Sequence, residues 1–251
     1  MKGVFIQQQL EFRLAVAGEG FRQGDSLPCT VAVKNRGGAD QAVGDLYLKL
    51  ACGDAKKVKD KAPDAFEVIA EASLLAPGTL KPGQEHTAES SFQLSKNSPI
   101  SEKSQSLYLL YGSSSIPQAE GVLLLTIAPH SHVQTILEIL ESSYQFVLKG
   151  QKSAGDWLTA KYKAPASSRF STVNELNLSF HFDADTLNLK YKFTVKKFEF
   201  AGGTSAVGIK KGKSEIDQTL EPARYLLPGG FVNHAGVEGA IGEVLDQIAP
   251  S

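Results

Sequence analysis

Apolar and polar positions alternate in short runs through the first half of the chain. Val4–Val16, Leu27–Lys34 and Asp45–Cys52 each place an apolar side chain at most second positions, which is the period of a half-buried strand. Stretches rich in glycine, asparagine and aspartate separate these runs and predict turns. Together with the later runs, up to Val122–Ile127, the pattern predicts about eight short strands and is typical of an antiparallel β-sandwich.

The periodicity changes at the midpoint of the chain, within residues 121–142. A strand-like apolar run ends there, and Pro129 then blocks regular strand pairing. Apolar residues follow at helical spacing, at Val133, Ile136, Leu137 and Leu140. We therefore predict a domain junction at this point, formed by Ala128, Pro129, His130 and Ser131.

The helix after this junction has a predicted start signal. Ser131 and Gln134 are spaced as the N-cap and N3 residues of a capping box, so we predict a helix of about three turns that begins at Ser131. A second helical stripe lies near the C-terminus, at Val237, Ile241, Val244, Leu245 and Ile248.

The second half also contains a clear hairpin pattern. Leu176–Phe182 and Leu187–Val195 alternate, and the four residues 183–186 join them as a predicted loop. The polar face of the second strand carries lysines. We predict partner-binding residues on this basic face, at Lys190, Lys192, Lys196 and Lys197.

Two other interpretations of the lysines stay open. Lysines on an exposed sheet face also maintain solubility and oppose edge-to-edge pairing. Alternatively, a basic face could bind phosphopeptides or anionic lipid head groups. The sequence predicts no aromatic residues on this face. Because single-stranded nucleic acid binds by stacking its bases on aromatic side chains, we do not expect it as a ligand.

Composition narrows the function classes. The 26 basic and 27 acidic residues nearly cancel, which argues against a general attraction to nucleic acid. Polar residues interrupt the N-terminal stretch, so no signal peptide is predicted, and no apolar window approaches the roughly 18 residues of a membrane span. We expect a cytoplasmic protein in which Cys29 and Cys52 are core thiols rather than a disulfide.

The candidate chemical motifs are incomplete. His130 and His132 lack neighbouring cysteine or acidic ligands in the sequence, so we interpret them as junction residues rather than a metal site. Residues 201–214 resemble a phosphate loop, but Gly208 stands one residue too late and we interpret the segment as a flexible basic loop. No G-x-S-x-G elbow is present. We therefore predict no catalytic, metal or cofactor-binding residues and no cofactor.

Three segments in order resemble a known family. They are LKPGQEHTAESSFQLSKNSPI at residues 80–100, the opening hairpin at Gly20–Lys34, and LTIAPHSHVQTILEIL at residues 125–140. Together they resemble the bacterial sporulation-control family of arrestin-like proteins. The chain departs from the family pattern at Gln23, where a proline is usual.

The resemblance implies an all-β fold with two arrestin-like antiparallel β-sandwich domains in tandem. They would occupy residues 1–128 and 129–251, with one short helix at the start of the second half and a C-terminal helix. It further implies a non-enzymatic cytoplasmic adaptor or regulatory scaffold that contacts an unidentified protein partner; a homo-oligomer stays open. The alternatives are a carrier of a small apolar ligand and the basic-face reader described above.

Overall fold

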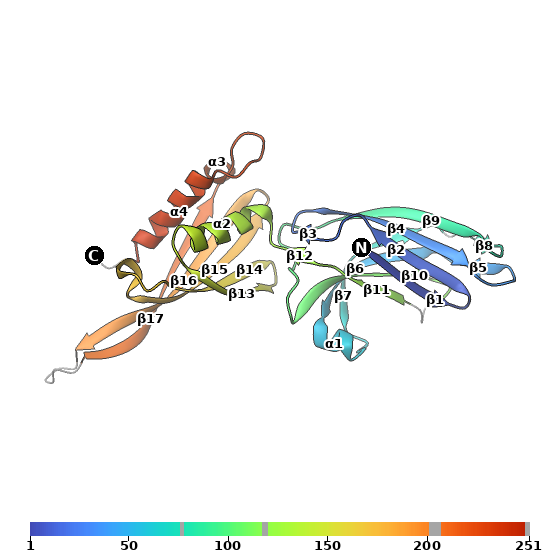
Figure 1. Ribbon diagram of the computed structural model, residues 1–251, viewed down its shortest axis with the longest axis horizontal. Coiled ribbons are helices and arrows are strands. Elements are labelled where there is room, and N and C mark those ends of the chain that lie inside the picture. The colour runs from blue at the N-terminus through green and yellow to red at the C-terminus, as the bar shows by residue number, and fades with distance from the viewer. Residues whose placement is uncertain (76–77, 117–119, 201–206, 249–251) are drawn as a thin grey trace. The chain divides into compact units, whose positions relative to one another are not determined.

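The computed structural model describes residues 1–75, 78–116, 120–200 and 207–248, excluding the side chains of residues 197–200 and 207–210. The chain divides into two compact units, Met1–Pro129 and His130–Ser251, here called unit 1 and unit 2. Figure 1 shows a chain made mostly of strands, which confirms the predicted all-β class. Among the helices of the described chain, none combines the length and apolar character that crossing a membrane requires.

Unit 1 is a sandwich of two four-stranded antiparallel sheets. One sheet has the order β1-β2-β4-β9 and consists of Lys2–Gln7, Leu10–Val16, Ser26–Asn35 and Glu85–Gln93. The other has the order β11-β10-β6-β7 and consists of Glu120–Leu124, Gln105–Ser113, Leu46–Asp54 and Phe66–Leu74. Shorter pairs are β5 (Gln41–Val43) with β8 (Gly78–Leu80) and, in parallel, β3 (Phe21–Arg22) with β12 (Ile127–Ala128). Helix α1 (Ala55–Lys59) follows β6.

The interior of this sandwich is filled with side chains. Phe12, Leu27, Leu48 and Leu107 are fully buried members of one continuous core that both sheets share. A small apolar ligand between these sheets would have to displace such side chains, each of which contributes about 2 kcal/mol by its burial.

The predicted strand Val4–Val16 is in fact a hairpin. Gln8 and Gln9 form a two-residue turn with φ of 49° and 65°, and Gln7 pairs with Leu10 across it. The sequence did not signal this turn, because glutamine is not one of the residues that usually adopt left-handed backbone geometry. Burial drives the turn instead: it directs Phe12 and Leu14 into the core.

Unit 2 is one five-stranded antiparallel sheet in the order β13-β14-β15-β16-β17. Its strands are Val147–Ala154, Trp157–Lys163, Val173–Asp183, Thr186–Phe200 and Val207–Leu220. The helices are α2 (Ser131–Ser142), α3 (Pro222–Tyr225) and α4 (His234–Asp246), with a 3-10 turn η1 at Ser168–Phe170. Figure 1 shows α2 and α4 over one face of the sheet, so the layer packed on this sheet is helical.

Both predicted helices of unit 2 are confirmed, with corrections at their ends. The N-cap of α2 is His130, whose Nδ1 accepts a hydrogen bond from the His132 backbone at 3.3 Å, and Ser131 is already helical. A histidine ring supplies the acceptor that the capping-box interpretation assigned to serine. The C-terminal helix buries Val237, Ile241, Val244 and Leu245, and ends before Ile248.

The hairpin of unit 2 is also tighter than predicted. Asp183 pairs with Thr186, so Ala184 and Asp185 alone form the turn, with Ala184 at a φ of 52°. The segment interpreted as a flexible basic loop is a strand from Val207 to Ser214, within β17, and its residues 201–206 lie outside the described chain.

Two tyrosines in the core of unit 2 differ in how their hydroxyl groups are satisfied. The Tyr191 hydroxyl donates to Gln218 Oε1 at 3.0 Å, and the Gln218 amide donates to the Ala240 carbonyl in α4 at 2.8 Å. The Tyr162 hydroxyl is buried without a hydrogen-bond partner among the described residues. Burial raises the pKa of both phenols well above the ordinary value, so both hydroxyls are neutral at physiological pH.

We therefore expect Tyr162→Phe to raise the free energy of unfolding by about 1 kcal/mol, because it removes an unsatisfied buried polar group. Tyr191→Phe is the matched control and should lower it by about 1 kcal/mol, because it leaves Gln218 without its donor. Urea unfolding monitored by tryptophan emission measures both. A loss of stability in Tyr162→Phe would show that its hydroxyl is satisfied in solution, for example by a buried water.

Candidate functional site

The face of the β13–β17 sheet opposite α2 and α4 is built from rows of polar side chains in register. Lys152, Thr159, Ser179, Lys190 and Asp217 form one such row across all five strands. Their side chains are exposed or half-buried, whereas the alternate positions, such as Leu178 and Leu189, are buried beneath the helices. The strict alternation of each strand therefore produces one apolar and one polar face.

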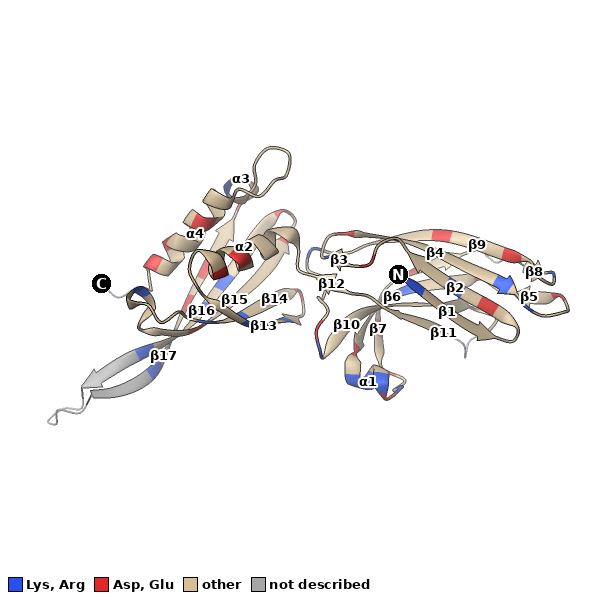
Figure 2. Ribbon diagram, in the orientation of Figure 1, with Lys and Arg blue, Asp and Glu red and all other residues tan. Residues whose placement is uncertain are grey.

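Positive charge predominates on this polar face, here called the basic face. Its described residues include eight lysines: Lys152, Lys161, Lys163, Lys190, Lys192, Lys196, Lys211 and Lys213. The acidic residues in the same rows are Glu175, Glu215 and Asp217. Figure 2 shows how the charged residues are distributed along these strands. Because the whole chain is almost neutral, this excess is local to one sheet face.

Three of the four predicted partner-binding lysines lie on the basic face. Lys190 and Lys192 are exposed and Lys196 is half-buried, all on β16. Lys192 Nζ lies 3.3 Å from Glu215 Oε2 on β17, while Lys196 faces Lys211 across the strand pair. Facing like charges destabilise a strand pair slightly. The Lys197 side chain lies outside the described residues.

An aromatic cluster lies on the same face, contrary to the expectation that aromatic residues are lacking there. Trp157 stacks on His181 with ring centroids 5.0 Å apart, and Lys190 Nζ lies 4.4 Å from the centre of the Trp157 ring. His181 Nδ1 is 3.0 Å from the Asp156 carbonyl, which fixes the imidazole plane. The cation–π contact holds the Lys190 ammonium above the sheet in a defined place. The alternation of Trp157 with the inward Leu158 and Ala160 was the signal that could have placed it outward.

The predicted junction residues have structural roles. The Ala128 carbonyl accepts a hydrogen bond from the Gln23 backbone at 3.1 Å, and Ala128 pairs with Arg22 as part of β12. His130 caps α2, and its ring contacts His132 and Phe182 with centroids 4.6 and 4.8 Å apart. Among the described residues, no group of three or more histidine, cysteine and acidic side chains is arranged to hold a metal.

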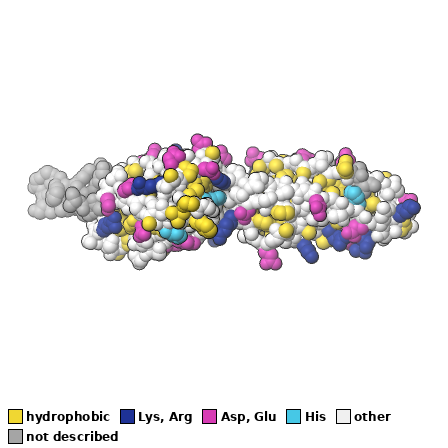
Figure 3. Space-filling model, turned by 90° about the horizontal axis from the view of Figure 1, so that it is seen from above, with side chains coloured by type: hydrophobic (Ala, Val, Ile, Leu, Met, Phe, Trp, Pro, Cys, Tyr) yellow, Lys and Arg dark blue, Asp and Glu magenta, His cyan; other side chains and the backbone are white. Residues whose placement is uncertain are grey.

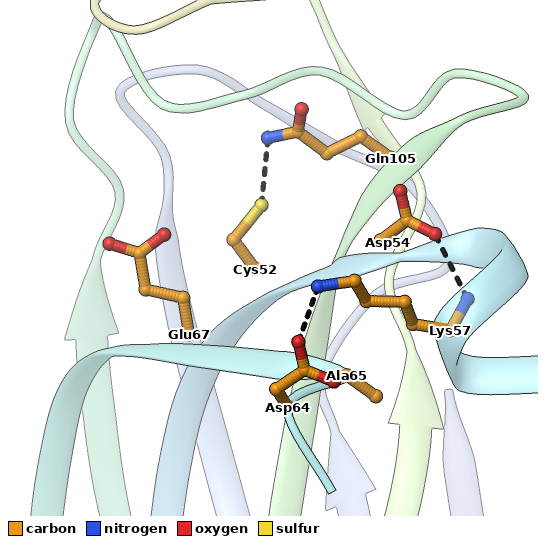
Figure 4. A pocket seen from close by; sticks show the side chains of 7 residues that line it. All are labelled: Cys52, Asp54, Lys57, Asp64, Ala65, Glu67 and Gln105. Carbon is orange, nitrogen blue, oxygen red and sulfur yellow. Dashed lines mark hydrogen bonds and ion pairs between the residues drawn. The ribbon is translucent and has the colours of Figure 1, made fainter. Parts of the chain in front are cut away.

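A small polar hollow of about 240 Å³ opens beside α1 in unit 1 (Figure 4). Cys52 Sγ accepts a hydrogen bond from Gln105 Nε2 at 2.8 Å, and Lys57 pairs with Asp64 at 2.5 Å. Desolvation raises the pKa of the Cys52 thiol, with the nearby Glu67 contributing, so the thiol is protonated rather than nucleophilic. Both Cys52 and the buried Cys29 are free thiols, as expected.

The loop between α3 and α4 exposes two large apolar side chains. Leu227 and Phe231 are 48% and 72% exposed, and the Leu227 backbone N–H donates to the Phe231 carbonyl at 2.7 Å. Figure 3 shows hydrophobic side chains gathered on this side of unit 2. The patch carries no charged group between Tyr225 and Asn233, so its chemistry differs from that of the basic face.

The described residues of unit 1 thus form a β-sandwich, and those of unit 2 form a sheet with one helical and one basic face. The sequence profile described as SpoOM protein matches residues 13–196. The chain therefore belongs to the SpoOM protein family, which confirms the predicted resemblance to the sporulation-control family.

A solved structure shares the fold of this chain. The crystal structure of Spo0M, a sporulation control protein from Bacillus subtilis, matches with a TM-score of 0.67 at 15% identity, over 97% of this chain and 100% of that one. A β-glucosidase from Listeria innocua matches half of this chain, and 17% of its own, with a TM-score of only 0.29 at 16% identity. No curated protein sequence matches.

Proposed function

We propose that this chain is a non-enzymatic regulatory adaptor that binds an acidic segment of a protein partner through the basic face. The observation that carries the proposal is the concentration of eight lysines against three acidic residues on one sheet face of a nearly neutral chain. A field of this kind accelerates association with an oppositely charged partner and sets the register of the complex.

The rest of the molecule supports a binding role. The polar hollow beside α1 contains a thiol with a raised pKa and an ion pair that is already satisfied, so it lacks an activated nucleophile. Membership of the SpoOM protein family favours a regulatory task, and the Bacillus subtilis relative of similar fold is titled a sporulation control protein. We propose the same setting for this chain, in the cytoplasm, as part of sporulation or stress control.

Charge reversal tests the proposal. The variant Lys190→Glu, Lys192→Glu, Lys196→Glu, Lys197→Glu should lose at least about tenfold in affinity for an acidic peptide, because attraction becomes repulsion. The probe is a fluorescein-labelled extended peptide of alternating glutamate and serine, measured by anisotropy. Binding should also weaken between about 50 and 300 mM salt, since the exposed charges are screened.

The control reverses three lysines around α1, as Lys56→Glu, Lys59→Glu, Lys61→Glu, which are exposed and lie in unit 1. This control should bind the peptide as the unaltered chain does. Equal affinity in all three proteins would contradict the proposal and leave the lysines with a solubility role. Affinity capture of proteins from a cell extract with the same three proteins would then identify the natural partner.

A further inference from the structure

One row of the basic face combines two lysines with two hydroxyl groups. Lys152, Thr159, Ser179 and Lys190 occupy consecutive strands in register, and we call them the anion row. The Thr159 and Ser179 hydroxyls lie 2.8 Å apart at its centre, where both side chains are half-buried. Neighbouring strands are about 4.8 Å apart, so the two lysines flank the hydroxyl pair within reach of their long side chains.

The Lys190 ammonium is positioned in advance for a ligand. It lies over the Trp157 ring at 4.4 Å, and the ring is braced by the stacked His181. This turns its charge toward β14, the strand that also carries Thr159, and away from Asp217 on β17. Trp157 lies one row along the face from the hydroxyl pair. A side chain that is already ordered loses less conformational entropy when it binds an anion.

The neighbouring row has a different composition. Its lysines are engaged in ion pairs, Lys161 with Glu175 at 3.1 Å and Lys192 with Glu215 at 3.3 Å. Lys152 and Lys190 form no ion pair with a described residue. Within this part of the face, the anion row thus offers two lysines that form no ion pair with a described residue. It also offers a hydroxyl pair in which one hydrogen is shared between Thr159 and Ser179 and the other is available to a ligand.

We infer that the anion row is a subsite for a phosphoryl group on a serine or threonine of the partner, an inference that rests on the proposed function of the basic face. A phosphoryl group carries nearly two negative charges and three acceptor oxygens, so it matches two ammonium groups and the free hydrogen of the hydroxyl pair better than a single carboxylate does. In an extended segment running along the strands, alternate side chains are about 7 Å apart, so the next acidic residue would face the adjacent row.

A peptide series tests this subsite. A fluorescein-labelled extended peptide with one phosphoserine among alternating glutamates is compared with the same peptide carrying serine or glutamate at that position. We expect the phosphoserine peptide to bind about tenfold more tightly than the glutamate peptide. Thr159→Val with Ser179→Ala should abolish that preference and retain binding of the glutamate peptide, because the lysines remain.

Two more variants test whether the preference for phosphoserine depends on the anion row. Lys190→Gln should also abolish the preference, whereas Lys213→Gln, on the same face but in another row, should retain it. The far-ultraviolet circular dichroism and unfolding midpoint of each variant establish that it is folded. A preference that survives in the hydroxyl-deleted and Lys190→Gln variants overturns the subsite.

The other sources of a phosphoryl group give distinct outcomes. If vesicles of phosphatidylglycerol bind in a Lys190-dependent manner while the three peptides bind equally, the ligand is a lipid head group and the inference is overturned. Equal binding of the three peptides without vesicle binding overturns the subsite and leaves the adaptor proposal intact. If no peptide binds at all, the proposed function fails as well.

Discussion

Gly121→Val is expected to lower the free energy of unfolding of the protein by about 2–3 kcal/mol. A Cβ atom at Gly121 would lie 2.6 Å from Phe5 Cδ1 and against the ring of Tyr111. These two rings form a cluster with Phe12, in which Phe5 stacks on Phe12 at 4.7 Å. The cluster joins β1 and β2 to β10 and lies against Gly121 of β11. Because Tyr111 is fully buried, the added methyl groups must displace its ring or separate β10 from β11.

Differential scanning calorimetry measures this loss. The matched control is Gly20→Val in the same unit, where a Cβ atom meets nothing within 4 Å, and its transition should stay close to that of the unaltered protein. If the Gly121→Val variant unfolded at the same temperature as the unaltered protein, this would contradict the packing described for β1 and β11.

Ile241→Asp is expected to undock α4 and to destabilise unit 2 by about 4 kcal/mol or more, because it buries an unpaired carboxylate. Ile241 is fully buried between Val237 and Leu245 on the face of α4 that contacts the sheet. The helix contains Gly236, Gly239 and Gly242, so its own propensity is low and docking holds it in place. Loss of helical circular dichroism at room temperature is the measurement.

The glycines of α4 provide internal controls. Gly239→Ala should stabilise unit 2 by up to about 1 kcal/mol, because Gly239 is exposed and its added Cβ meets nothing within 4 Å. Gly236→Ala should destabilise it, because the Cβ would collide with the Arg224 carbonyl. If both substitutions changed the stability of unit 2 in the same direction and by the same amount, this would contradict the close contact between α4 and the Arg224 carbonyl.

The strands of the chain could be predicted from its sequence because burial and alternation coincide. Leu176, Leu178 and Phe180 are buried and their polar neighbours are not, as the period of two requires. The turn at Gln8 and Gln9 could not be predicted, because long-range packing rather than local preference selects it. The position of α2 and α4 as a second layer on the sheet of unit 2 could not be predicted either. Their apolar stripes indicate a buried face but not the surface against which that face packs.

The candidate site could be predicted in part. The lysine pattern of β16 placed Lys190 and Lys192 on a polar face, and the structure agrees. The contribution of β13 and β14 required strand order and register, which a single sequence does not contain. For that reason Trp157, two strands from Lys190, was missed as a member of the same cluster.

Trp157 is also the one tryptophan of the chain, so its emission reports directly on the basic face. The measurement that tests the central claim is a titration of this emission with the glutamate–serine peptide, in parallel with anisotropy. We predict a saturable change in emission with the same midpoint as the anisotropy, which added salt reverses and the four-lysine reversal variant lacks. Peptide binding at unchanged Trp157 emission, with equal affinity in that variant, would contradict the assignment of the basic face as the binding surface.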